Sequence, residues 1–213
     1  MKAFITFEGI EGCGKTTQLR LAAEHLENRK IPHIFTEEPG GSRLGKKIRE
    51  ILLTEEPYPI GARAELLLFA AARAQHVDEV ILPALKAGNL VLCDRFTDAT
   101  LAYQGFGRAI DIDFIRVLND FSCPSLKPDL TLLFDLPVEA GLNRAMDRIA
   151  RTTGSRREDR FEKEGTAFHQ RIRAGYLSLV GQDPDRFRVI DALRDIATVH
   201  HEVCNHLASF IGR

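Results

Sequence analysis

A glycine-rich run at positions 9–16, Gly-Ile-Glu-Gly-Cys-Gly-Lys-Thr, contains the clearest chemistry in the chain. It matches the phosphate-binding pattern G-x-x-x-x-G-K-[ST], the P-loop, with an apolar run before it and a helical pattern after it. In such a loop the backbone N–H groups point at phosphate oxygens. We expect Lys15 to reach the β- and γ-phosphates and the Thr16 hydroxyl to coordinate Mg²⁺. The predicted ATP-binding residues are Gly9, Ile10, Glu11, Gly12, Cys13, Gly14, Lys15, Thr16 and Thr17.

A second pair of chemistry-bearing residues, Asp94 and Arg95, follows another apolar run. An arginine beside that carboxylate suits an enzyme that must hold a second phosphorylated substrate, because a guanidinium binds phosphate through two parallel hydrogen bonds. A structural ion pair between the two residues is the alternative. A GTPase would need a D-x-x-G segment and an N-K-x-D segment, and the sequence contains neither. The pattern therefore favours a small-molecule kinase over a nucleotide-dependent switch or motor.

Arginines are concentrated between positions 144 and 160. The segment has three acids against six arginines, which are Arg144, Arg148, Arg151, Arg156, Arg157 and Arg160. Its middle, at 152–155, has the composition of a loop. We therefore expect a cationic lid at about 148–160, between two helices; a solvated charged flap is the alternative for part of it.

Apolar runs bounded by turn residues alternate with segments of helical period, and these elements must position the residues above. The predicted strands are 4–8, 32–36, 90–94, 130–135 and 187–190. The predicted helices are 15–29, 43–53, 62–87 (interrupted or ended near Pro83), 112–121, 138–149, 161–180 and 196–211. Strands that alternate with helices indicate a parallel sheet covered on both faces. We expect a single α/β domain over residues 1–213.

The composition is that of an ordinary globular protein, with 213 residues, 44% hydrophobic and 28% charged. A net charge of −1 provides no global attraction to nucleic acid or to an anionic membrane, so neither is an expected partner. We find no room for a signal peptide before the first motif and no apolar stretch of about 20 residues. Three histidines near the C-terminus, at 200, 201 and 206, suggest a solvated helix face rather than a metal site. The widely spaced cysteines indicate free thiols in a reducing cytoplasm; they are Cys13, Cys93, Cys123 and Cys204.

Five short blocks occur together in a recognisable order and spacing. They are Phe7-Glu8-Gly9, Glu38-Pro39-Gly40-Gly41, Asp94-Arg95-Phe96, Leu101-Ala102-Tyr103-Gln104-Gly105 and Asp159-Arg160-Phe161-Glu162. From residue 4 to about 190 the chain resembles the bacterial thymidylate kinases, which are P-loop nucleoside monophosphate kinases. The resemblance implies a P-loop NTPase three-layer sandwich, with a five-stranded parallel sheet in the order 2-3-1-4-5 and an arginine-rich lid.

The resemblance also implies a reaction. The γ-phosphoryl group of ATP would pass to dTMP, giving dTDP and ADP in dTTP biosynthesis, by direct in-line transfer with Mg²⁺. Members of the family form homodimers, commonly through the long helices after the second and third strands, and the apolar run 66–69 is compatible with that. A kinase for another nucleoside or nucleoside monophosphate, or a regulatory module that binds ATP without an acceptor, is the alternative.

Residue roles follow from the same resemblance. Arg95 resembles the arginine that holds the dTMP phosphate in line with ATP, and Asp94 the carboxylate that acts on Mg²⁺ through a water molecule. Glu11 matches an acid that contacts the 3′-hydroxyl of the acceptor sugar. Lid arginines would supply positive charge to the transferred group, where one arginine can be worth ~10³–10⁵ in rate. The predicted catalytic residues are Lys15, Asp94, Arg95, Arg148 and Arg151.

The base and the sugar of dTMP are assigned in the same way. Phe69 would stack on thymine and Arg73, four residues later, would donate to its O4 carbonyl, which cytosine replaces with an amino group. Thr100 and Gln104 are similar to residues that read the other thymine edge, and Tyr103 to the aromatic that crowds the sugar 2′ position. Plain core packing is the alternative for Phe69 and Tyr103. Together with Glu11 and Arg95 these are the predicted substrate-binding residues.

Two positions depart from the family pattern. Glu37 stands where members often have a basic residue before the Glu-Pro-Gly-Gly block, which weakens the expectation that this position contacts the acceptor phosphate. Cys13 replaces a small inert residue in the phosphate loop, and we expect its thiol to be sensitive to oxidation near the helix N-terminus.

Overall fold

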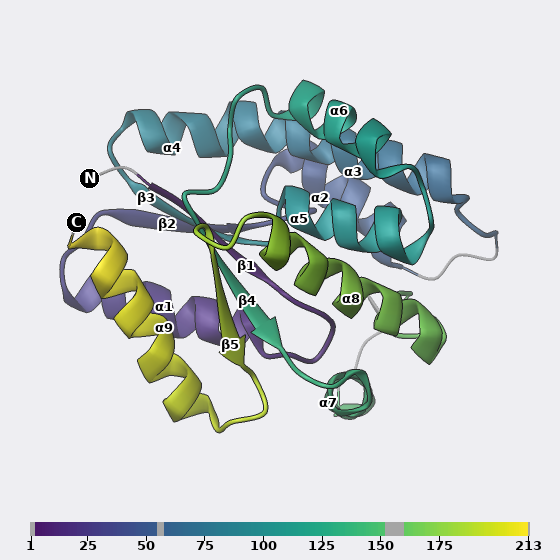
Figure 1. The fold of residues 1–213 in the computed structure, drawn as a ribbon. Coiled ribbons are helices and arrows are strands. Elements are labelled where there is room, and N and C mark those ends of the chain that lie inside the picture. The colour runs from purple at the N-terminus through teal and green to yellow at the C-terminus, as the bar shows by residue number, and fades with distance from the viewer. Residues whose placement is uncertain (1–2, 55–57, 152–159, 213) are drawn as a thin grey trace.

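The sheet has five parallel strands in the order β2-β3-β1-β4-β5, as predicted (Figure 1). The computed structural model describes residues 3–54, 58–151 and 160–212. The strands are β1 (Ala3–Glu8), β2 (His33–Glu37), β3 (Leu90–Asp94), β4 (Leu130–Asp135) and β5 (Phe187–Asp191). All six residues of β1 are buried, because helices cover both faces of the sheet at its centre.

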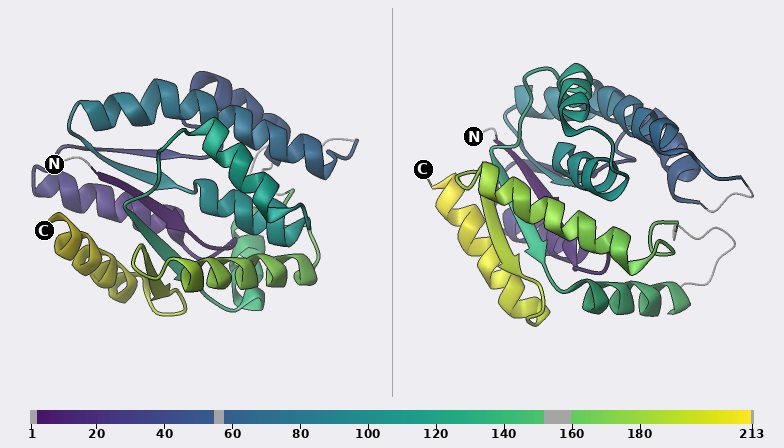
Figure 2. Two further views of the ribbon diagram at one scale, coloured as in Figure 1. Left: turned by 45° about the horizontal axis from the view of Figure 1, so that its top comes forward. Right: turned by 45° about the vertical axis from the view of Figure 1, so that its right-hand side comes forward.

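Helices lie on both faces of the sheet and complete the expected three layers (Figures 1 and 2). They are α1 (Lys15–Asn28), α2 (Arg43–Leu53), α3 (Ala62–His76), η1 (Val77–Ile81), α4 (Leu82–Lys86), α5 (Thr97–Thr100), η2 (Leu101–Gly107), α6 (Ile112–Ser122), α7 (Val138–Arg151), α8 (Thr166–Gln182) and α9 (Ile196–Ile211). The pair α1 and α9 covers one face, whereas α3, α4 and α6 lie over the other. None of the helices described is long and apolar enough to cross a bilayer.

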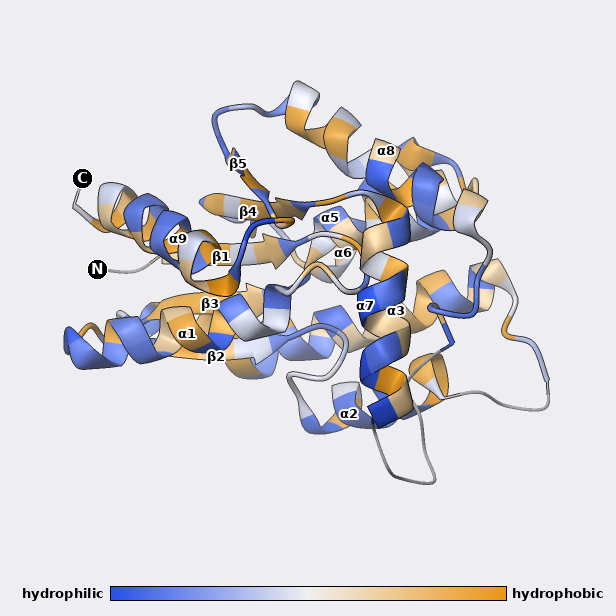
Figure 3. Ribbon diagram, turned by 90° about the horizontal axis from the view of Figure 1, so that it is seen from below, coloured by the Kyte–Doolittle hydropathy of each residue, from blue (hydrophilic) through white to orange (hydrophobic). Residues whose placement is uncertain are grey.

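Strand β1 shows how the sequence pattern separates the two halves of the core. Ile5 and Phe7 point into the cluster beneath α1 and α9, whereas Phe4 points into the cluster beneath η1 and α4. There Phe4 meets Phe96 edge to face, with ring centroids 4.8 Å apart. Burying a side chain of this size contributes about 1.5–3 kcal/mol. In Figure 3 the central strands are largely hydrophobic, while α1 and α9 alternate polar and apolar turns.

The stretch 62–87 is helical and, as expected, is interrupted near Pro83: it widens there into the π-helical segment η1, because the proline ring would clash with the preceding turn of a regular helix. One other helix prediction needs correction. The helix expected at 161–180 begins only at Thr166, after Gly165, because Phe161 is buried in the turn before it. We predicted no helix at 97–107, where α5 and η2 run; burial there overrides the turn tendency of two glycines.

The carboxyl ends of β1, β2 and β3 lie at one edge of the sheet. Phe7 of β1 and Glu37 of β2 are both in register with Asp94 of β3. The phosphate loop, the turn that follows Glu37 and the residue that follows Asp94 therefore meet there, as expected where a parallel sheet carries its ligand site.

Candidate active site

A cleft of ≈ 700 Å³ opens at this edge of the sheet. It lies between the phosphate loop, α3, η2, the end of α7 and the turn before α8. Its lining carries six cationic residues, namely Lys15, Arg20, Arg49, Arg73, Arg95 and Arg148. Five carboxylates line the same cleft, namely Glu11, Glu37, Glu38, Asp94 and Glu162, so its charge is mixed. Those cations that can turn toward a ligand are able to bind its anionic groups.

The backbone of the phosphate loop has positive φ at three glycines, of which Gly9 and Gly14 are fixed in the motif and Gly12 is not. Gly9, Gly12 and Gly14 have φ values of 142°, 70° and 87°. A Cβ on Gly9 would lie 2.5 Å from the Phe134 carbonyl oxygen, and one on Gly12 would clash with the backbone of Gly141 at the start of α7. The loop therefore packs tightly between β4 and α7, and this packing fixes the orientation of its amides.

Lys15 spans the phosphate loop. Its Nζ donates to the Gly9 and Ile10 carbonyl oxygens, both at 3.0 Å, and lies 3.4 Å from the Cys13 Sγ. The side chains of Ile10 and Cys13 are buried and do not line the cleft, so these two residues can serve a phosphate only through their backbone amides. Thr17 lines the cleft one residue beyond the motif.

Thr16 and Asp94, the two predicted metal residues, are in contact. The Thr16 hydroxyl donates to Asp94 Oδ2 at 2.7 Å, and both residues line the cleft. A hydroxyl and a carboxylate are hard oxygen donors, so this pair fits Mg²⁺, which commonly keeps several waters and takes one or two protein oxygens.

Arg95 is held by the phosphate loop and not by its neighbour Asp94. Its NH2 donates to Glu11 Oε1 and its NH1 to the Gly9 carbonyl oxygen, both at 3.0 Å. The guanidinium also lies over the Tyr103 ring, 4.7 Å from the centroid. The backbone φ of Arg95 is +68°, a left-handed conformation that is uncommon outside glycine and that concentrates at functional sites.

Glu11 is a buried acid that stays charged. Burial alone would raise its pKa, but His169, Arg95 and Lys15 outweigh that effect and lower the pKa to about 2. His169 Nδ1 lies 3.3 Å from Glu11 Oε2, and the Tyr103 hydroxyl donates to Oε1. His169 on α8 was not among our predicted site residues, since nothing around it in the sequence distinguishes it from a core histidine.

Glu8 shows the opposite behaviour. Its side chain is buried, and burial together with the charge of Asp98 raises its pKa to about 8. Its carboxyl group accepts from the Phe96 amide at 2.8 Å and from the Tyr176 hydroxyl at 2.7 Å. Glu8 thus ties the end of β1 to the residue after Arg95 and to α8, a role that its place in a family block does not reveal.

Arg73 is buried in the wall of the cleft, with 2% of its surface exposed. It donates to Glu38 Oε2 and Asn119 Oδ1 at 2.8 Å each, to Thr100 Oγ1 at 2.9 Å and to the Phe96 carbonyl oxygen at 3.0 Å. These bonds use four of its five N–H groups. Its orientation is fixed, and one N–H is left for a ligand.

The other predicted base-binding residues surround Arg73 and line the cleft. Phe69 is half-buried, with its ring centroid 6.3 Å from that of Phe161. Tyr103 meets Phe161 edge to face at 5.5 Å. Gln104 donates to Glu65 at 2.9 Å. The structure therefore gathers all the predicted base and sugar residues on one wall, with an open aromatic face.

Arg49 on α2 is a site residue that sequence reasoning missed. It lines the cleft, donating to Glu37 Oε2 at 3.0 Å and to the Pro39 carbonyl oxygen at 2.8 Å. The acid at position 37 is thus paired with a cation from the next helix. In the sequence, Arg49 stands on an ordinary amphipathic pattern, and only the turn between β2 and α2 brings it to the cleft.

The arginines of the predicted lid are not equivalent. Arg148 lines the cleft and donates to Glu162 at 2.8 Å, whereas Arg151 is exposed at the end of α7. Arg160 donates to Glu65 Oε2 at 2.7 Å, the acid that also accepts from Gln104, and does not itself line the cleft. Residues 156 and 157 lie outside the described ranges. Arg144 donates to the Ala192 carbonyl oxygen at 2.8 Å, away from the phosphate loop.

Comparison with known proteins agrees with this geometry. The family model of Thymidylate kinase matches residues 7–203. The chain belongs to the thymidylate kinase family. A thymidylate kinase from Syntrophus aciditrophicus (strain SB) is 61% identical over 207 residues, covering 97% of this chain and 94% of that protein. One from Geotalea daltonii is 54% identical over 191 residues, covering 90% and 89%.

A solved structure supports the same family. The crystal structure of thymidylate kinase from Ehrlichia chaffeensis superposes with a TM-score of 0.75 at 35% identity and covers 97% of this chain and 98% of that one. The P-loop fold and the predicted membership of the thymidylate kinase family are thereby confirmed. Membership makes the protein an ATP-dependent nucleoside monophosphate kinase, a phosphotransferase.

Proposed function

We propose that the cleft binds ATP and dTMP together and passes the γ-phosphoryl group directly between them, giving ADP and dTDP for dTTP biosynthesis. The observation that carries this proposal is that the phosphate loop and the Arg95–Glu11 pair line one cleft with a wall of aromatic and hydrogen-bonding side chains. With both nucleotides bound, the triphosphate and the acceptor nucleoside would lie on either side of a single arginine.

On the ATP side, the amides of residues 9–17 would surround the phosphates. Lys15 would exchange its two carbonyl partners for the β- and γ-phosphate oxygens. Thr16 and Asp94 would hold Mg²⁺, the latter through a water molecule. When bound, the ion neutralises charge on the phosphate oxygens.

On the acceptor side, Arg95 would bind the dTMP phosphate through the edge of its guanidinium that the phosphate loop leaves open, and Glu11 would accept from the sugar 3′-hydroxyl. Phe69 would stack on thymine, and the remaining N–H of Arg73 would donate to O4. Thr100 and Gln104 would meet the other edge of the base, and Tyr103 would exclude a 2′-hydroxyl. These bonds discriminate against cytosine, whose amino group would face a donor.

Transfer spreads negative charge over the equatorial oxygens of the phosphoryl group, and cations held in fixed positions stabilise that charge. Among the lid arginines, Arg148 is best placed for this role because it already lines the cleft. Arg151 would need the end of α7 to turn inward. The lid at about 148–160, within a single domain of 1–213, stays a prediction, since 152–159 lie outside the described ranges.

We also propose a homodimer in the cytoplasm. Of the run 66–69, Leu66 is core and only Leu67 is well exposed, at 57%. A stronger apolar face lies on α6, which packs against α3: Phe114, Val117 and Phe121 are 54%, 67% and 82% exposed. Val117→Asp should halve the mass measured by light scattering, while an unchanged mass would count against this face. The four free cysteines suit a reducing compartment.

A coupled ADP-release assay with a panel of nucleoside monophosphates tests the proposed reaction. We expect turnover with dTMP, weaker turnover with dUMP and none with CMP or GMP, and we expect chelation of divalent metal to abolish it. Equal rates on CMP or GMP would overturn the assignment of the base-binding wall. Saturable binding of MgATP with no turnover on any monophosphate would leave only a nucleotide-binding module.

A further inference from the structure

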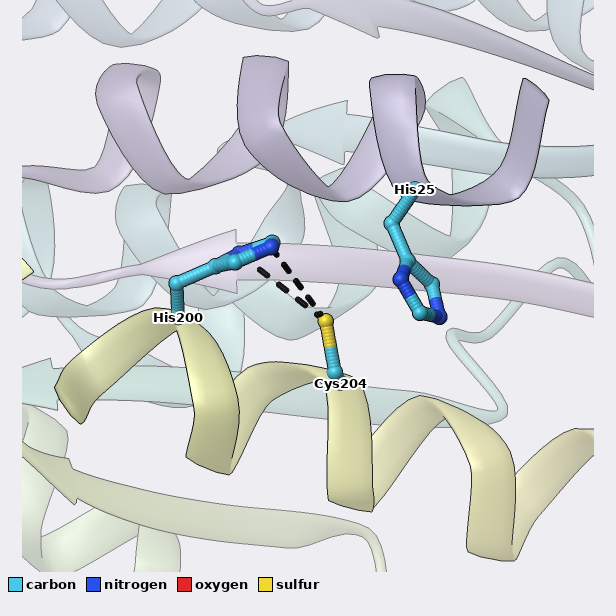
Figure 4. Close-up of side chains that lie close together, drawn as sticks. All are labelled: His25, His200 and Cys204. Atoms are coloured by element: carbon cyan, nitrogen blue, oxygen red, sulfur yellow. Dashed lines mark hydrogen bonds between the residues drawn. The ribbon is translucent and has the colours of Figure 1, made fainter. Parts of the chain in front are cut away.

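Three metal-ligating side chains meet on the far side of the sheet from the base-binding wall. His25 comes from α1, and His200 and Cys204 from α9, one helical turn apart (Figure 4). One ligand atom from each residue lies within 4.8 Å of the other two. The Cys204 Sγ is 3.4 Å from His200 Nε2, and the two imidazole rings are 6.2 Å apart. The cluster brings together two imidazoles and one thiol. Its residues come from distant parts of the sequence, since His25 and His200 are 175 positions apart.

We propose that His25, His200 and Cys204 form a binding site for Zn²⁺ that joins α1 to α9. Two nitrogens and one sulfur are ligands that zinc prefers, and a water molecule would complete four-coordination. Mg²⁺ and Ca²⁺ favour oxygen ligands, so the ion that accompanies ATP would not compete here.

The distances suit a zinc ion after small side-chain rotations. Bonds of about 2.0–2.3 Å to a tetrahedral zinc ion place the ligand atoms about 3.3–3.8 Å from one another. The His200–Cys204 pair already has this spacing at 3.4 Å. His25 must approach by about 1 Å, which a half-buried side chain can do by changing its χ angles.

The surroundings of the cluster are also compatible with metal. All three residues are partly exposed, so an ion can enter from solvent.

The proposed site is remote from phosphoryl transfer. His25 lies ten residues after Lys15 on α1, about 15 Å along the helix. Zinc would therefore act on the packing of α9 against α1 and not on the phosphates. A ligand that binds only the folded protein stabilises it. We therefore expect zinc to raise the Tm, while turnover with MgATP is the same with and without zinc.

The test uses reduced, untagged, full-length protein freed of metal, with Co²⁺ as the spectroscopic probe and Zn²⁺ in calorimetry. We expect one Zn²⁺ per chain, and for Co²⁺ an intense thiolate-to-metal charge-transfer band with visible bands of tetrahedral intensity. Cys204→Ser should lose the charge-transfer band, because it removes the thiolate. Both Cys204→Ser and His25→Ala should bind Zn²⁺ at least about tenfold more weakly, since even outer-shell partners change metal affinity by about 10–100-fold.

Matched controls separate this site from other ligands. His201→Ala removes the exposed neighbouring imidazole and should bind Zn²⁺ like the parent. Cys13→Ala removes the thiol of the phosphate loop and should keep the charge-transfer band. Normal kinase activity in Cys204→Ser would show that this variant is folded. The proposal is overturned if the parent shows no thiolate band, or if Cys204→Ser and the parent bind zinc equally.

Discussion

The Glu11 carboxylate and the Arg95 guanidinium lie 3.0 Å apart, although 84 residues separate them in the sequence. Glu11 belongs to the phosphate loop after β1 and Arg95 to the turn after β3, so one ion pair joins the two sides of the cleft. Both side chains are largely buried, at 9% and 20% exposure, which keeps the interaction stronger than a surface pair. The arginine is therefore in position before an anionic ligand arrives, and little reorganisation is needed during transfer.

Replacing Arg95 with lysine should reduce catalysis strongly. The planar guanidinium reaches Glu11, Gly9 and a ligand at once, and a lysine cannot match that geometry. We expect kcat/KM for dTMP to fall by about 10²–10³, with little change in the KM for ATP. Steady-state kinetics measures this, and Arg171→Lys is the control, because Arg171 on α8 donates to the Gly107 carbonyl oxygen of η2 and does not line the cleft. A loss below threefold would contradict the assigned role.

Glu8 should make stability depend on pH. Its pKa is about 8 in the folded protein against an ordinary 4.5, so between these values the folded state holds a proton that the unfolded chain has released. Stability therefore falls as pH rises through this window and levels off above it. In Glu8→Gln this fall should shrink by an amount of order 1 kcal/mol or more, since one pKa unit corresponds to ~1.4 kcal/mol.

Urea denaturation from about pH 5 to pH 8 measures the effect. Glu11 contributes with the opposite sign: its pKa is lowered to about 2, so its stabilisation is present above 4.5 and is lost as pH falls toward 2. That contribution is common to the parent and to Glu8→Gln. Identical slopes for the two proteins would mean that Glu8 is ionised throughout.

Gly141 should tolerate no side chain, because α7 touches the phosphate loop there. A Cβ on Gly141 would lie 2.6 Å from the Glu11 carbonyl oxygen. Gly141→Ala should push α7 away from the loop, cost about 1–3 kcal/mol of stability and raise the KM for ATP, since a misplacement of about 1 Å can cost up to 10²-fold.

Gly181→Ala is the matched control for that variant. Gly181 is exposed on α8, and a Cβ there meets nothing within 4 Å. We expect Gly181→Ala to retain activity and to gain up to about 1 kcal/mol of stability, as an alanine does in a helix. Equal behaviour of the two alanine variants would show that the contact between α7 and the loop is unimportant.

Arg73→Ala should destabilise the protein as well as weaken selectivity for thymine. The substitution leaves the buried Glu38 without its main partner, 2.8 Å away, and breaking such a pair costs about 3–5 kcal/mol. The double variant Arg73→Ala/Glu38→Gln should recover part of that loss, because it removes both charges. Chemical denaturation of the four proteins of this cycle checks the prediction, and additive effects would exclude coupling between the two residues.

Much of the fold was predictable because it depends on neighbours in the chain. Local properties include the periodicity of the strands, the start of α1 after Gly14 and the glycine conformations of the phosphate loop. The sequence pattern predicts them directly. The resemblance of short blocks supplied the strand order and the base-binding residues. Local pattern failed at 97–107, where Gly105 and Gly107 predict turns while packing against α8 imposes a helix.

By itself, the sequence determined that a triphosphate cradle follows a buried strand, and it named the arginine that faces the cradle. Only the tertiary structure decided that Arg95 pairs with Glu11 rather than with its neighbour Asp94, and that His25, His200 and Cys204 form a cluster. The physical reason is that charge pairing and ligand clusters depend on sheet register and helix packing. Those arrangements bring together residues that no local periodicity relates.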